Sequence, residues 1–76
     1  MGGRRLRMLK AQDIARVLRR LGFREVRQTG SHIFFQHSDG RTTLVSRHSR
    51  EDIGRGLLRQ ILREIEIPPE EFSKYL

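Results

Sequence analysis

The stretch FREVRQTGSHIFFQHSDGRTTLV (residues 23–45) decides the fold, because strand-forming residues recur in it around two turns. Gly30-Ser31 is the first predicted turn. Asp39-Gly40 is the second, since this pair tolerates the positive φ of a tight hairpin. The segments around the turns are rich in β-branched and aromatic residues, which favour strands. The expected strands are Phe23–Thr29, His32–His37 and Arg41–Val45.

Alternation along these strands indicates which side chains face the core. In the first strand the alternation is loose, and Phe23 and Val26 are the predicted inward contacts. In the second strand, parity does not decide between Phe34 and Phe35, because a bulge after the first turn would reverse the register.

A helix is predicted on each side of the strands. The first runs from about Ala11 to Leu21, and Gly22 ends it by supplying a left-handed backbone conformation. The second runs from about Gly54 to Ile65 and stops before Pro68-Pro69. Apolar residues with helical spacing are Ile14, Val17, Leu18 and Leu21 in the first helix, and Leu57, Leu58, Ile61, Leu62 and Ile65 in the second.

The last residues predict a short acidic helix that begins at Pro69. Proline favours the first helical position, and the acids of Glu70-Glu71 suit the positive end of the helix dipole. Phe72 and Leu76 are expected to fold back onto the core. The order is therefore α-β-β-β-α with a helical tail. Both helices are expected on one face of a three-stranded antiparallel sheet, which makes the fold class α+β and leaves the other face open.

The 76 residues are expected to form one domain. A chain of this length buries only about 60% of the surface that its unfolded form exposes, so its core is small. Residues 1–8 are expected to be a flexible basic leader. Any active site should lie on an open face, because there is no second lobe to close over a substrate.

The formal net charge of +7 comes almost entirely from arginine, with 14 Arg against 2 Lys. Residues 1–63 hold 15 basic and 5 acidic side chains, a balance of +10, whereas residues 64–76 have a balance of −3. Arginine offers a planar fork of donors that matches phosphate, so nucleic acid is the favoured partner. An anionic membrane surface and an acidic protein are alternatives. Arginine-rich surfaces also occur in thermophilic proteins without functional meaning.

Several function classes are disfavoured by composition. The chain has no cysteine, which excludes disulfides, zinc knuckles and thiol chemistry. No apolar run is long enough for a membrane span and no signal-peptide core is visible, so the expected location is the cytoplasm. Asp13, Glu25 and Asp39 lie on different predicted elements. No metal site is therefore predicted, and no cofactor is expected.

Three histidines are candidates for acid–base chemistry, because their ordinary pKa lies near neutrality. His32 follows the Gly30-Ser31 turn, where a side chain can project. RNA is cut without metal when one group takes the proton of the 2′-hydroxyl and another protonates the leaving oxygen. A turn histidine bonded to backbone is the alternative for His32. His48 could assist catalysis, contact phosphate or form a hydrogen bond across its turn. His37 is interpreted as exposed and inert.

The order of landmarks resembles the HicA family. In the first half these are Leu21-Gly22-Phe23, Gly30-Ser31-His32, Phe35 and Asp39-Gly40. In the second half they are Val45-x-x-His48, Gly56-x-Leu58-x-x-Ile61-Leu62, and Ile67 with Glu70-Glu71-Phe72. The resemblance runs from about Met8 to Phe72. One departure is Ser46, where the family commonly has proline, a residue that fixes φ; the placement of Arg47 and His48 is therefore less defined.

The resemblance implies a fold similar to a double-stranded-RNA-binding domain. It implies a ribosome-independent toxin that cleaves mRNA, with His32 as the catalytic histidine and with a HicB-type antitoxin partner that covers it. From charge and position, the expected RNA contacts are Gly30, Ser31, Arg47, His48, Arg16 and Arg20. Two alternatives stay open: a non-catalytic RNA-binding module of the same fold, and a protein-interaction domain whose basic face meets an acidic partner.

Overall fold

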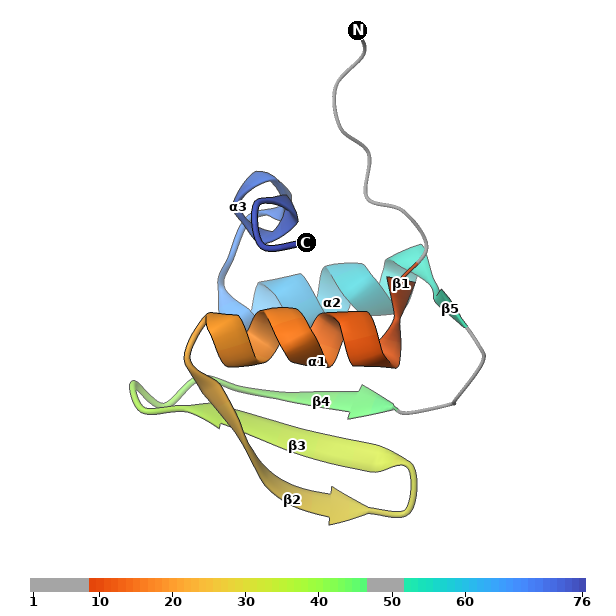
Figure 1. Cartoon of the computed structure of the whole chain (residues 1–76), viewed down its shortest axis with the longest axis vertical. Helices are drawn as coiled ribbons and strands as arrows, with labels where there is room; N and C mark the ends of the chain where they lie inside the picture. The colour runs from red at the N-terminus through yellow and green to blue at the C-terminus, as the bar shows by residue number, and fades with distance from the viewer. Residues whose placement is uncertain (1–8, 47–51) are drawn as a thin grey trace, which may run out of the picture.

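The computed structural model describes residues 9–46 and 52–76. Figure 1 shows two helices stacked over one face of a twisted sheet, with a short third helix at the C-terminal end. The longer elements are α1 (Ala11–Arg20), β2 (Phe23–Thr29), β3 (His32–His37), β4 (Thr42–Ser46) and α2 (Arg55–Ile65). The shorter elements are β1 (Leu9–Lys10), β5 (Asp52–Ile53) and α3 (Pro69–Ser73).

The main sheet is antiparallel, in the order β2-β3-β4, with β3 at its centre. α1 contacts both β2 and β4, and α2 contacts β4. Both helices therefore cover the same face, as Figure 1 shows, and in the described part of the chain nothing packs on the other face. The predicted α+β class, with its α-β-β-β-α arrangement like that of a double-stranded-RNA-binding domain, is confirmed.

The core lies between the sheet and the helices, and it settles which phenylalanine of β3 faces inward. Phe35 and Ile33 are buried, whereas the side chains that alternate with them lie on the open face. Burying a side chain of this size contributes about 1.5–3 kcal/mol, so this register is strongly favoured over its alternative. The buried apolar side chains are Leu9, Ala11, Ile14, Ala15, Val17, Leu18, Phe23, Ile33, Phe35, Val45, Ile53, Leu58, Ile61, Leu62, Ile65 and Phe72.

The prediction that Val26 faces the core is wrong. The ladder between β2 and β3 shifts at this position: Glu25 is opposite Phe35 and Arg27 is opposite Phe34, which leaves Val26 without a partner. Val26 is 48% exposed. A bulge of this kind places two residues opposite one, so the side-chain alternation is interrupted there and resumes with the opposite parity.

The ends of α1 follow the predicted signals, to within one residue. The carboxylate of Asp13 accepts a hydrogen bond from the backbone N–H of Lys10 at 3.1 Å, which satisfies a free donor of the first turn. The helix ends at Arg20, and Leu21 is half-buried against the core. Gly22 then takes a φ of +99°, a conformation that favours glycine.

Two apolar side chains predicted to pack inward do not. Leu57 in the first turn of α2 is 37% exposed, and Leu76 is 51% exposed. α2 lies against β4, the edge strand of the sheet, so a side chain on its flank extends past that edge and lies beside a groove. Phe72 is fully buried as predicted. Phe72 and the half-buried Tyr75, rather than Leu76, therefore pack the helical tail onto the core.

A short antiparallel pair joins two distant segments, and the sequence did not predict it. Leu9 is opposite Ile53, and Lys10 is opposite Asp52. This pairing fixes the start of α1 next to the start of α2 (Figure 1). Leu9 and Ile53 are both buried, so the pair also closes one end of the core.

The hairpin between β3 and β4 forms at the predicted place. Gly40 has a φ of +102°, and the backbone N–H of His37 donates to the carbonyl oxygen of Arg41 at 2.8 Å. The interpretation of His37 as exposed is wrong. Its ring is half-buried and packs edge-to-face on Phe23 with 5.0 Å between ring centroids, and its Nδ1 accepts the backbone N–H of Asp39 at 3.1 Å.

Candidate active site around His32

His32 is the first residue of β3, the central strand. Thr29 of β2 is opposite it on one side and Ser46 of β4 on the other, so ladders on both sides hold its backbone. Its side chain is exposed, and within the described residues the ring makes no hydrogen bond. His37, at the other end of the same strand, has its ring committed to packing and to the hairpin. Of the two histidines that the structure describes, His32 is the one available to a ligand.

A groove of about 280 Å³ lies beside His32, between the free edge of β4 and the flank of α2. Its floor includes apolar side chains, and its wall carries one carboxylate. Glu64 accepts hydrogen bonds from Thr43 Oγ1 at 2.6 Å and from Gln60 Nε2 at 3.3 Å, so the α2 wall is tied to the sheet. The lining residues are His32, Leu44, Ser46, Leu57, Gln60, Ile61 and Glu64.

The α2 side of this groove was not among the predicted site residues. Leu57, Gln60 and Glu64 follow one another along one flank of α2, beside its apolar stripe, at spacings of three and four residues. That spacing is a helical signal. It does not tell which strand the flank faces, since the packing of α2 on β4 is a property of the whole fold.

Gly30 and Ser31, two of the expected RNA contacts, form the turn that leads into His32. Gly30 has a φ of +58°, and its carbonyl oxygen accepts a hydrogen bond from Gln28 Nε2 at 3.3 Å. A Cβ added to Gly30 would meet nothing within 4 Å. The turn is therefore open to solvent and adjacent to the histidine.

The expected arginine contacts are not gathered at His32. Arg16 lies on the outer side of α1 and forms an ion pair with Asp13 at 2.6 Å. Arg20 ends α1, three residues before the start of β2 at Phe23, which is opposite His37. Arg20 is thus at the end of the sheet away from His32, about 17 Å along β3. The expected contacts Arg47 and His48 lie outside the described residues.

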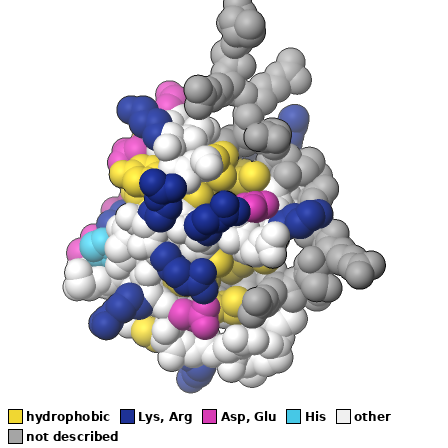
Figure 2. Space-filling model, viewed as in Figure 1, with side chains coloured by type: hydrophobic (Ala, Val, Ile, Leu, Met, Phe, Trp, Pro, Cys, Tyr) yellow, Lys and Arg dark blue, Asp and Glu magenta, His cyan; other side chains and the backbone are white. Residues whose placement is uncertain are grey.

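On the face shown in Figure 2, the basic side chains of the described residues are interspersed with acidic ones. Figure 2 shows Lys and Arg side chains gathered over α1, with acidic side chains among them. One such pair is Arg19 with Glu25, whose atoms lie 2.9 Å apart. Exposed pairs of this kind contribute at most about 1 kcal/mol. They nevertheless reduce the net positive potential of the α1 surface.

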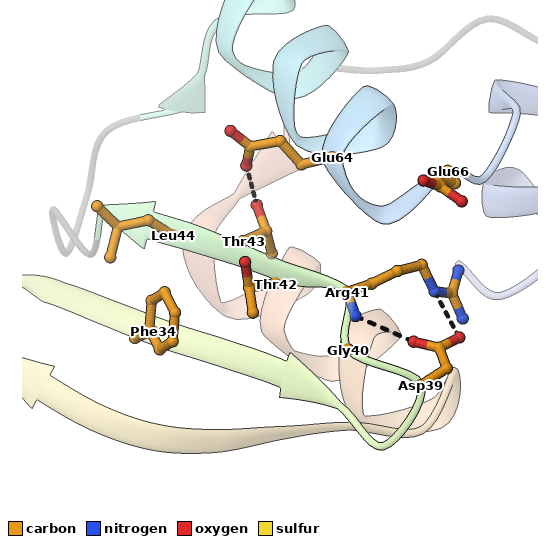
Figure 3. A pocket seen from close by; sticks show the side chains of 9 residues that line it. All are labelled: Phe34, Asp39, Gly40, Arg41, Thr42, Thr43, Leu44, Glu64 and Glu66. Atoms are coloured by element: carbon orange, nitrogen blue, oxygen red, sulfur yellow. Dashed lines mark hydrogen bonds and ion pairs between the residues drawn. The ribbon is translucent and has the colours of Figure 1, made fainter.

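A second, larger groove of about 660 Å³ lies farther along β4, beside the hairpin (Figure 3). Arg41 crosses it: its backbone N–H and its Nε donate to Asp39 at 3.0 and 2.8 Å, and its guanidinium also donates to the carbonyl oxygen of Ile65. The N–H of Arg41 and its guanidinium hold the pKa of the Asp39 carboxyl below the ordinary value. Arg41 is thereby committed to joining the hairpin to the end of α2.

Over residues 9–46 and 52–76, no three or more His, Cys, Asp or Glu side chains are grouped as metal ligands would be. None of the helices in that part of the chain has the length and apolar character needed to cross a membrane.

Comparison with known proteins adds the family to this geometry. The sequence model of the HicA toxin of bacterial toxin–antitoxin systems matches residues 11–67, which are 57 of the 76 residues. The chain belongs to the HicA family. No match was found among curated proteins.

Family membership places this HicA chain among the toxins of toxin–antitoxin systems and implies an antitoxin partner. The matched segment includes all of α1, the three-stranded sheet and α2. It therefore includes the turn at Gly30, the exposed His32 and both grooves. The resemblance read from the order of landmarks in the sequence is confirmed.

Proposed function

We propose that this HicA-family chain is an endoribonuclease that inhibits translation by cutting mRNA, with His32 as its catalytic histidine. The observation that supports this most directly is the state of the His32 ring, which is exposed and unbonded within the described residues on a backbone held from both sides. Such a ring is positioned by the sheet and yet free to exchange a proton with a substrate.

The proposed reaction is a transesterification in which the 2′-hydroxyl of the RNA attacks the adjacent phosphorus. One group removes the proton of that hydroxyl, the bond from phosphorus to the 5′-oxygen breaks, and another group protonates the departing oxygen. His32 fills one of these two roles, because an imidazole nitrogen can either accept or donate a proton. The products are a 2′,3′-cyclic phosphate and a 5′-hydroxyl end.

The turn before His32 suits an approach by the RNA backbone. Gly30 and Ser31 have small side chains, and the space beyond Gly30 is open. A phosphate can therefore come close to the main chain at the point where β3 begins. Arg47 and His48, next along the chain after Ser46, are proposed to hold the same phosphate, and a HicB-type antitoxin is the proposed partner that covers this site.

The decisive test is His32→Ala, assayed for RNA cleavage in vitro and for growth arrest on expression. Loss of a general acid or base lowers the rate about 10²–10⁴-fold. The fold should survive because the side chain is exposed. Glu70→Gln, an exposed position on α3 away from the sheet (Figure 1), is the control and should cut RNA at the wild-type rate. Unaltered cleavage by a folded His32→Ala protein would refute the assignment.

Two readouts separate a chemical role from a structural one. Free imidazole should restore part of the cleavage rate of His32→Ala, since it can supply the missing proton acceptor or donor in solution. The products of the wild-type protein should carry 5′-hydroxyl ends, and cleavage should continue in excess chelator. Products with 5′-phosphate ends would show a hydrolytic mechanism of another class.

A further inference from the structure

The open face of the sheet has a defined set of side chains, which the strand register arranges in three rows across β2, β3 and β4. Residues directly opposite one another in antiparallel strands project from the same face. The rows are Arg24–Gln36–Thr42, Arg27–Phe34–Leu44 and Thr29–His32–Ser46. His32 therefore lies on this face, in the row next to the one that contains Phe34.

The bulge at Val26 determines which residues of β2 join this face. Without it, regular alternation from Phe23 would direct Arg27 toward the helices. Because the ladder shifts between Glu25 and Arg27, Arg27 instead lies opposite Phe34. Arg24 and Arg27 are thus on the same face of one strand, although they are three residues apart.

The charge on this face is positive and uncompensated. Within the described residues, Arg24 and Arg27 form no ion pair, and none of the three rows contains an acidic side chain. The acid of the same strand, Glu25, is opposite Phe35 and pairs with Arg19 of α1. By contrast, the α1 surface contains Arg16 and Arg19, both of which are already paired with acids.

The middle row adds an apolar surface beside these arginines. Phe34 is half-buried and Leu44 is 47% exposed, and the two are opposite one another on β3 and β4 (Figure 3). Neither contributes to the core on the other face of the sheet. An aromatic ring next to an unpaired guanidinium is the combination on which proteins stack the unpaired bases of single strands.

We propose that the open face of the sheet binds single-stranded RNA, with Phe34 stacking on a base and Arg24 and Arg27 contacting phosphates. The Phe34 row lies about 7 Å from His32 along β3, so a strand bound there leads directly to the histidine. The inference rests on the proposed nuclease function and adds to it the form of the substrate and the path that it follows.

The alternative surface for RNA is the outer side of the helices, as the overall fold type suggests. An RNA bound over α1 would lie on the helix side of the molecule, whereas His32 projects from the opposite face of the sheet. The RNA would have to pass around the edge of the sheet to reach the histidine. The α1 arginines are also partly neutralised by Asp13 and Glu25. Both observations favour the open face and an unpaired strand, which can follow a sheet more closely than a rigid duplex.

The test measures binding separately from cleavage, by fluorescence anisotropy with a short single-stranded oligonucleotide that is 2′-O-methylated throughout. Such a probe has no attacking hydroxyl and cannot be cut by transesterification. Phe34→Leu should weaken its binding roughly 5- to 150-fold, because stacking on a base is lost while apolar bulk is kept. Phe34→Tyr keeps the ring and should bind as the wild type does.

The arginine variants are tested through the salt dependence of the same binding. Each phosphate contact with a single strand contributes about 0.7 to the slope of log K against log salt concentration. The Arg24→Gln/Arg27→Gln variant should therefore have a slope smaller by about 1.4. Arg59→Gln/Arg63→Gln is the matched control, since it removes the same charge from exposed positions on α2 and should keep the slope.

The outcomes distinguish this inference from its competitors. Wild-type binding by Phe34→Leu and by the Arg24/Arg27 variant would overturn it, and a loss confined to Arg16→Gln/Arg20→Gln would place the RNA on the helices instead. If the open-face variants bind RNA normally but lose affinity for an antitoxin, the face is a protein-docking surface and the inference is wrong. Loss of RNA binding by these variants, together with wild-type cleavage by His32→Ala, would retain the RNA surface and reject only the catalytic histidine.

Discussion

At the scale of single residues, the two histidines of β3 differ in their surroundings. His32 and His37 are five positions apart, so regular alternation places their side chains on opposite faces of the sheet. His37 is on the helix face, where it contacts Phe23 and accepts the N–H of Asp39. His32 projects from the other face. Because side chains alternate along the strand, His37 stabilises the hairpin whereas His32 is available to a ligand.

Gly22 is predicted to be required for two reasons, of which only one is visible in the sequence. Its φ of +99° disfavours any residue with a Cβ, and a Cβ built there would lie 2.9 Å from Nε2 of His37. The His37 ring cannot move away freely, since Phe23 and Asp39 hold it. Gly30→Ala meets a φ of +58° but no neighbour, so it is the natural comparison.

We therefore expect Gly22→Ala to lower the free energy of unfolding more than Gly30→Ala does. A left-handed conformation in a non-glycine residue costs about 1–3 kcal/mol, which both variants share. The close contact should add about 1–3 kcal/mol at Gly22 alone. Urea unfolding of the two variants measures the difference directly. Equal losses would mean that His37 gives way and that the contact carries no cost.

At the scale of elements, the sequence predicted each of the main helices and strands. It did not predict features that depend on contact with another segment of the chain. The bounds of β3 and the hairpin at Asp39-Gly40 follow from local propensity and turn chemistry. The bulge at Val26 does not, because it depends on which residues of β3 face β2. The pairing of β1 with β5 is likewise a contact between distant segments that have no strong strand signal of their own.

The candidate site, too, contains residues set by local signals and residues set by long-range packing. His32 was identified because a turn before a strand is a local feature, and the family landmarks mark it as well. The groove side chains Gln60 and Glu64 were missed, since only the packing of α2 on β4 brings them near His32. The residues of the open face were missed for a related reason: Arg27 reaches it only through the bulge.

The bulge gives a stability prediction at this scale. Val26→Thr should change the free energy of unfolding by no more than about 0.5 kcal/mol, because Val26 is half-exposed and has no partner in the ladder. Ile33→Ala, which removes a side chain that is 3% exposed, should cost about 2–5 kcal/mol. Thermal or urea unfolding of both variants provides the measurement. A large loss at Val26 would show that its side chain packs inward in solution, as the sequence alone suggested.

At the scale of the whole molecule, the charge is divided between segments rather than spread evenly. Residues 1–63 have a balance of +10, and residues 64–76 have a balance of −3. Three acids, Asp39, Glu64 and Glu66, line the groove along β4, at the edge opposite β2. Arg24 and Arg27 lie on β2. A polyanion is thus attracted to one side of the open face and repelled from the other.

This distribution bears on how an antitoxin silences the protein. Within the described residues nothing covers the exposed side chain of His32, so inhibition by direct contact requires that the partner cover the histidine and the arginines of the open face. A basic surface attracts an acidic partner and speeds their encounter, while the contacts buried afterwards set how long the complex lasts. We therefore expect the association rate of toxin and antitoxin to fall as salt rises, with a smaller effect on dissociation.

Covering of His32 also predicts that bound antitoxin and bound RNA exclude each other. If RNA crosses the open face to reach His32, an antitoxin that covers the histidine occupies the end of that path. Titrating the uncleavable single-stranded RNA against the preformed toxin–antitoxin complex tests this, with size-exclusion chromatography to follow both partners. We expect RNA to appear with the toxin only as antitoxin is released. A stable complex of all three components, with RNA bound at its ordinary affinity, would contradict the prediction, because the antitoxin would then have to act by changing the shape of the toxin or by controlling its synthesis.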